Sequence, residues 1–77
     1  MKIKVRGVRN IRISGEYIKL DALLKYASFV STGGEAKLRI INGDVSVNRD
    51  ICTLRGKKVR PGDVVRIGEF TALVNRL

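Results

Sequence analysis

The chain has 77 residues and carries 16 Lys and Arg against 7 Asp and Glu, a formal net charge of +9. A chain of this length buries only ~60% of the surface that it exposes when unfolded, so one domain with a thin core is expected over residues 1–77. The charge excess favours a polyanionic partner, with nucleic acid ahead of an anionic membrane. A soluble domain with a solvated basic face is the alternative.

Several classes of protein are excluded by composition. The chain has no His and a single Cys, Cys52, which rules out an internal disulfide and the usual zinc ligand sets. No apolar run reaches the ~18 residues of a membrane span, and residues 1–8 lack the unbroken apolar stretch of a signal peptide. We therefore expect a cytoplasmic protein with no membrane partner, metal or other cofactor.

The first 19 residues alternate apolar and polar side chains in short runs. Ile3 and Val5 alternate with cations, Gly7 interrupts the pattern and residues 11–13 resume it, which predicts a loose hairpin over residues 2–13. A turn is expected at Ser14–Gly15, and a short extended piece follows it.

Two helices are predicted next. From Leu20 the apolar residues recur at i, i+3, i+4 and i+7, which is one stripe of a helix: Leu20, Leu23, Leu24 and Ala27. Thr32 and Glu35 form a capping-box pattern at the start of a second helix. Its apolar side comprises Ala36 and Ile40, with Ile41 as a further candidate, and Gly43 is expected to end it in a left-handed conformation.

The remainder is expected to form strands and turns, and the whole an α+β fold: two short helices packed on a small, mostly antiparallel sheet. Strands are predicted at residues 45–47, 51–54, 64–67 and 70–74. Turns are predicted at residues 48–50, at Pro61-Gly62 and at Gly68-Glu69, the last as a type II′ hairpin. Residues 55–58 form an exposed basic loop.

Two segments are candidate phosphate-binding sites. Helix N-termini present unpaired N–H groups and a positive dipole, and Gly33 and Gly34 at such a terminus leave room for a phosphate. The same glycines are equally typical of an ordinary tight helix entry. Residues 55–60 place four cations in six positions, which by itself is most often a solvated loop. We expect the two segments to converge into one positive surface.

Aromatic and catalytic residues are scarce. Of the four aromatic residues, Phe29 and Phe70 are expected in the core, and Tyr26 would stack on a base if exposed. Recognition of single strands depends on exposed aromatic platforms, so the expected target is structured RNA read through its backbone and shape. Without His, no pair of residues is visibly placed for acid–base catalysis, and we expect no enzyme.

Four segments in this order resemble the S4-type RNA-binding domain, the two-helix αL motif. They are Lys19-Leu20-Asp21, residues 32–37, residues 42–48 and residues 61–65. The resemblance covers about residues 17–67, leaves residues 1–16 as possible extra strands, and is greatest to the small stand-alone bacterial members, the YaaA/YbcJ-like group.

The resemblance implies RNA contacts at the start of the first helix and along the second helix, which here are Lys19, Lys37 and Arg39. Two positions depart from the family pattern, because Gly33 replaces an Arg and Arg49 replaces the Gly of a hairpin Asn-Gly. The complete set of candidate RNA-binding residues is Lys19, Thr32, Gly33, Gly34, Lys37, Arg39, Arg49, Arg55, Lys57, Lys58 and Arg60.

The leading hypothesis is a non-enzymatic protein that docks this basic face on structured RNA, ribosomal or tRNA-like. The ribosome or its assembly intermediates are the corresponding partners. The alternative is a protein-interaction or assembly factor that uses the basic face or a free strand edge at residues 2–6. Binding of duplex DNA is a third possibility.

Overall fold

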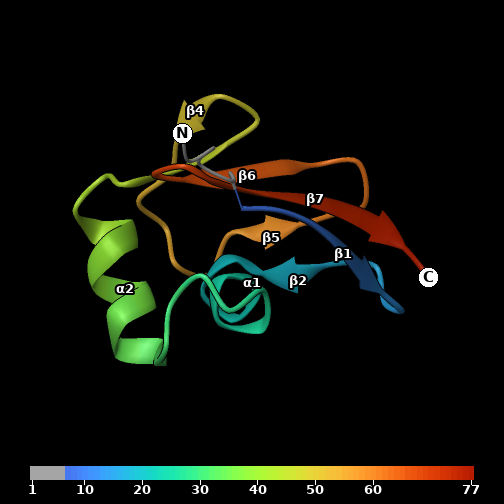
Figure 1. Cartoon of the computed structure of the whole chain (residues 1–77), viewed down its shortest axis with the longest axis horizontal. Coiled ribbons are helices and arrows are strands. Elements are labelled where there is room, and N and C mark those ends of the chain that lie inside the picture. Colours follow the sequence, from blue (N-terminus) through green and yellow to red (C-terminus); the bar gives the residue numbers. More distant parts are fainter. Residues whose placement is uncertain (1–6) are drawn as a thin grey trace, which may run out of the picture.

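The computed structural model describes residues 7–77, which form an α+β arrangement. Both helices lie on the same side of a five-stranded sheet (Figure 1). The helices are α1 (Leu20–Tyr26) and α2 (Gly33–Ile41). The strands are β1 (Val8–Ile13), β2 (Ile18–Lys19), β3 (Val45–Val47), β4 (Asp50–Ile51), β5 (Lys58–Val59), β6 (Val64–Ile67) and β7 (Phe70–Arg76).

The strand order of the main sheet is β1-β7-β6-β3-β4, and β2 and β5 form a separate two-stranded ladder. Every pair in the main sheet is antiparallel except β1 with β7, which run parallel from Val8↔Thr71 to Ile13↔Arg76. The predicted mostly antiparallel sheet is therefore confirmed. The predicted hairpin over residues 2–13 is not tested, because residues 2–6 lie outside the described residues.

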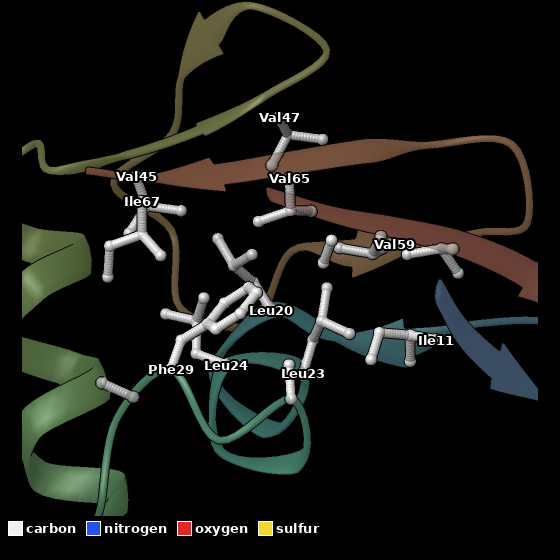
Figure 2. Close-up of a cluster of buried hydrophobic side chains, with 14 of the residues drawn as sticks. Ile11, Leu20, Leu23, Leu24, Phe29, Val45, Val47, Val59, Val65 and Ile67 are labelled. Atoms are coloured by element: carbon white, nitrogen blue, oxygen red, sulfur yellow. The ribbon is translucent and has the colours of Figure 1, made fainter. Parts of the chain in front are cut away.

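The core lies between the sheet and the helices (Figure 2). Leu20, Leu23 and Leu24 of α1 are fully buried, as the helical spacing predicts, and they meet inward-facing strand residues such as Val65 and Ile67. Among residues 7–77, no polar or charged side chain is buried. The cations of this part of the chain therefore all lie on the surface.

The ends of α2 follow the predicted chemistry. The Thr32 hydroxyl accepts a hydrogen bond from the Glu35 N–H (3.1 Å), while the Glu35 carboxylate accepts one from the Ser31 N–H (2.9 Å). The reciprocal bond thus reaches one residue beyond the N-cap. Gly43 has φ +83° and ends the helix, as predicted. Ile41 was a candidate for the buried side, but it is 53% exposed because it lies at the edge of the apolar stripe.

Positive φ angles occur at the predicted turns. Asn48 and Arg49 have φ 52° and 78°, the pattern of a two-residue type I′ hairpin between β3 and β4. Gly62 has φ +98°, and the Asp63 N–H donates to the Arg60 carbonyl (3.0 Å) in a type II turn. Gly68 has φ +60° at the β6–β7 turn, which is consistent with the predicted type II′ hairpin.

Three predictions from the sequence were wrong. The loop expected over residues 55–58 ends at Lys57, because Lys58 begins β5 and pairs with β2. The strand expected over residues 51–54 ends at Ile51, because the chain leaves the sheet there and only the Cys52 N–H still bonds to β3, at the Val45 carbonyl (2.9 Å). Phe70 is 43% exposed rather than buried, because it lies at the hairpin end of β7, where its ring stacks on Phe29 with centroids 5.1 Å apart.

Candidate nucleic-acid interface

The start of α1 is capped by the backbone of the basic loop. Lys19 occupies the N-cap position without a side-chain hydrogen bond. The Leu20 N–H donates to the Lys57 carbonyl (2.9 Å), and the Asp21 N–H donates to the Arg55 carbonyl (3.1 Å). Two orphan N–H groups of the helix are thus satisfied by loop carbonyls. The loop is fixed through its main chain, and the side chains of Arg55 and Lys57 stay exposed.

The β2–β5 ladder brings two more cations together. Lys19 lies directly opposite Lys58, and both are exposed. Like charges directly opposite one another on a sheet are destabilising. The ladder is held by its other pair, in which the half-buried Ile18 lies opposite the fully buried Val59. An anion bound between the two ammonium groups would offset their repulsion.

A groove between α2 and the basic loop adds the helix cation. Lys37 and Ile41 line it from α2, and residues 53–57 line it from the loop, including Arg55 and Lys57. Lys37 therefore lies on the same side of the molecule as the loop cations. The groove brings Lys37 together with Arg55 and Lys57 of the basic run, whereas Lys58, Arg60 and the two glycines at the start of α2 do not line it.

The Tyr17 ring contacts two further cations, Lys58 and Arg60. The Lys58 Nζ is 4.9 Å from the centre of the Tyr17 ring, and the Arg60 Cζ is 6.0 Å from it. Both distances are in the range of a cation–π contact. The ring thus fixes two of the cations close to one another at the N-terminal end of β2.

Two predicted cations are placed differently. The Arg39 Nε lies 3.0 Å from the Asp44 Oδ2, so its charge is partly neutralised by an ion pair. Arg49 lies on the β3–β4 turn and lines a separate groove with Arg66. Arg66 is exposed between buried β6 residues, on the sheet face turned away from the helices. Arg49 is thus outside the group formed by Lys37 and the loop.

The glycine-rich start of α2 is only partly available to a ligand. The Thr32 hydroxyl is occupied by the Glu35 N–H, while Gly33 and Gly34 are exposed. An added Cβ at Gly33 would meet no atom within 4 Å, so the backbone is open to solvent there. Gly33 lies one helical turn before Lys37 and on the same side of α2. These residues border the groove rather than line it.

Sequence reasoning missed part of the surface. Arg12 and Lys25 lie with Tyr17 and Tyr26 around a second groove, on the side of α1 away from α2. Tyr26 is 64% exposed, which meets the condition set for base stacking. The residue types were visible in the sequence, but their grouping depends on the pairing of β1 with β7, for which no local signal exists.

Two negative findings concern the described part of the chain. Within residues 7–77, no group of three or more His, Cys, Asp or Glu residues could hold a metal ion. The two helices described there are both too short and too polar to cross a membrane.

Comparison with known proteins identifies the family. Residues 11–75 match the family model of the S4 domain. The chain belongs to the S4 domain family. The match confirms the resemblance seen in the sequence and extends it beyond residues 17–67, since it also covers the second half of β1 and most of β7. Family membership indicates RNA binding, and S4 domains are generally non-enzymatic.

A named relative supports the same assignment. The chain is 40% identical over 60 residues to the probable ribosome maturation protein RlbA of Bacillus subtilis (strain 168). The alignment covers 78% of this chain and 84% of the relative. The relative is thus itself a small protein in which the S4 match occupies most of the length.

Proposed function

We propose that this S4 protein binds structured RNA through phosphate and shape contacts and catalyses no reaction. The observation that supports it is the grouping of cations from β2, from α2 and from residues 55–60, which include β5, around the start of α1. We call this group the basic surface: Lys19, Lys37, Arg55, Lys57, Lys58 and Arg60. Within it, α1, α2 and the loop act as the two-helix αL arrangement of the family.

The basic surface is suited to a phosphate backbone. Its cations are spread over β2, α2, the loop and β5, with Arg60 just after β5, so they match a row of anions better than a single small ligand. The loop is held by its carbonyls at α1, which reduces the entropy lost when its side chains bind. Lys19 and Lys58 repel one another until an anion lies between them.

Ribosomal RNA, or a tRNA-like structure, is the proposed target class. The relative's name refers to ribosome maturation, which supports a precursor ribosomal particle as the partner. The exposed cations of the groove between α2 and the loop, Lys37, Arg55 and Lys57, suit phosphate contacts across the wide, shallow minor groove of an A-form helix.

The test removes one cation of the basic surface from α2 and one from β5. In Lys37→Glu/Lys58→Glu both residues are exposed, so folding is expected to be preserved. Affinity for a ribosomal RNA hairpin should fall on the order of tenfold to thirtyfold at moderate salt. The slope of log K against log salt concentration should decrease in magnitude by about 1.5 to 2, because two phosphate contacts are lost.

A charge-matched control separates location from net charge. Arg49→Glu/Arg66→Glu changes the charge equally but acts in the groove on the other side of the sheet. It should change affinity and salt slope much less than the first variant. Equal losses in both variants, or no loss in the first, would overturn the proposed surface. Measuring duplex DNA of equal length at the same salt concentration decides between RNA and DNA.

The second candidate function is protein interaction. The specific observation is apolar exposure beside the cations, with Ile41 53% and Leu54 68% exposed in the same groove. The alternative strand edge at residues 2–6 lies outside the described residues, whereas β1 is an edge of the described sheet. Capture of one acidic protein that survives nuclease treatment, without co-purifying RNA, would favour this candidate.

A further inference from the structure

A second groove opens between the β1–β2 connection and α1. Its walls include Arg12 at the end of β1, Tyr17 before β2, and Ala22, Lys25 and Tyr26 of α1. Its volume is about 840 Å³, within the range of ligand-binding clefts. The basic surface does not use this groove except through Tyr17.

The two tyrosines of the chain both line this groove. Tyr26 is 64% exposed and Tyr17 is 41% exposed. A single exposed tyrosine is normal on a protein surface. Two in one groove provide flat aromatic faces of the kind on which unpaired bases stack, and stacking tolerates any base.

The charge of the groove indicates the ligand. Arg12 and Lys25 line it, and within residues 7–77 no Asp or Glu side chain does. Glu16 is adjacent in sequence but is not part of the wall. Aromatic rings and cations that line the same groove suit a nucleotide, since the base stacks and the phosphate is neutralised.

The groove is continuous with the basic surface at Tyr17. The Tyr17 ring lies 4.9 Å from the Lys58 Nζ, and the same residue forms part of the groove wall. A chain of nucleotides leaving an RNA helix docked on Lys58 would therefore reach Tyr17 first.

Beyond Tyr26 the cationic path continues along β1. A neighbouring shallow groove is lined by Arg9, Arg12 and Tyr26, so two of its residues are shared with the first groove. Of the two cations, Arg12 lines both grooves, whereas Arg9, whose Cζ lies 5.9 Å from the centre of the Phe29 ring, lines only the second of them. The RNA-binding surface thus extends from the site for an RNA helix to a groove that suits single-stranded RNA.

We propose that this groove binds an unpaired nucleotide segment that flanks the RNA helix docked on the basic surface. Tyr26 and Tyr17 stack its bases, and Arg12 and Lys25 neutralise its phosphates. This inference rests on the proposed function. It adds that the preferred RNA is a helix with a single-stranded extension rather than a blunt helix.

Intrinsic fluorescence gives a direct readout. The chain has no Trp and two Tyr, so its tyrosine emission reports only Tyr17 and Tyr26. A ribosomal RNA hairpin with a four-nucleotide single-stranded flank, tested at either end, should quench this emission and bind about tenfold more tightly than the blunt hairpin. Hexa-adenylate alone should quench it weakly.

The variant Tyr26→Leu isolates the groove, because Tyr26 is exposed and is not part of the basic surface. The tenfold preference for the flanked hairpin should disappear while affinity for the blunt hairpin is unchanged. Tyr26→Phe keeps the ring and should keep the preference. Leu38→Ala, at an exposed position on α2, is the matched control and should leave both affinities unchanged.

Two results overturn the inference while leaving RNA binding in place. One is equal affinity of the native protein for flanked and blunt hairpins. The other is a preference that persists in Tyr26→Leu. Absence of binding to both hairpins refutes the proposed function, and with it the inference of a flanked helix. In that case quenching of the tyrosine emission by hexa-adenylate shows separately whether the groove binds unpaired nucleotides.

Discussion

The interior and the connection from Cys52 to Lys57 are held in contrasting ways. In the interior, fully buried side chains such as Leu24 and Val65 fix α1 against the sheet. In the connection, most side chains are exposed and the main chain makes the contacts, through the Arg55 and Lys57 carbonyls at α1. The fold therefore depends on buried side chains and main-chain contacts, whereas the surface charge depends on exposed side chains. A substitution in one group should leave the property that depends on the other group unchanged.

A large change in the interior gives the strongest test of this separation. Leu24→Ala removes a side chain that is 0% exposed and should lower the free energy of unfolding by about 2 to 5 kcal/mol. Urea denaturation measures it. Leu38→Ala, 61% exposed on α2, should cost less than about 1 kcal/mol. RNA affinity of the folded Leu24→Ala protein should equal that of the native protein, and a loss at fixed folded fraction would contradict the separation.

A smaller effect is expected where the β3–β4 turn is fastened to β6. The Asn48 Oδ1 accepts from the Val64 N–H (2.9 Å), and its Nδ2 donates to the Asp63 Oδ1 (3.0 Å). Asn48→Ala loses both bonds and places Ala at φ 52°, which should lower the unfolding free energy by about 1 to 3 kcal/mol. Thermal denaturation checks this.

A glycine at the same position separates the two causes. Asn48→Gly also loses both hydrogen bonds but accepts the positive φ without strain. Its unfolding free energy should lie between those of the native protein and Asn48→Ala. If Asn48→Gly and Asn48→Ala were equal, the backbone conformation would contribute nothing, and the hydrogen bonds alone would hold the turn.

The smallest expected effect has the opposite sign. Arg49 has φ 78°, so Arg49→Gly should raise the unfolding free energy by about 0.5 to 1 kcal/mol by relieving backbone strain. RNA affinity should change little, because Arg49 lies outside the basic surface. A clear loss of affinity would return Arg49 to the RNA-binding residues and would extend the contact to the far side of the sheet.

Local signals in the sequence predicted the elements whose causes are local. The spacing of Leu20, Leu23 and Leu24 predicted α1, because residues three and four positions apart lie on the same face of a helix and are buried together. Thr32 and Gly43 predicted the limits of α2 to within a residue, because caps act on neighbouring backbone groups.

Features that depend on distant residues were not predictable. The parallel pairing of β1 with β7 joins residues about 63 positions apart, and the sequence of neither strand indicates which strand pairs with it. The capping of α1 by the Arg55 and Lys57 carbonyls uses main-chain atoms, which are the same for every residue type. The ion pair between Arg39 and Asp44 depends on the path of the chain after α2. The sequence therefore could not show that the charge of Arg39 is partly neutralised.

The position of β7 between β1 and β6 has a consequence for synthesis. β7 occupies an interior place in the sheet although it follows β1 by about 60 residues, so β1 remains unpaired there until residues 70–76 have left the exit tunnel. Pairing between segments so distant in sequence is slow, because the intervening chain must be ordered first. Pairing of β1 in the sheet is therefore expected to be a late step of folding, and loss of β7 would leave two sheet edges open to other chains.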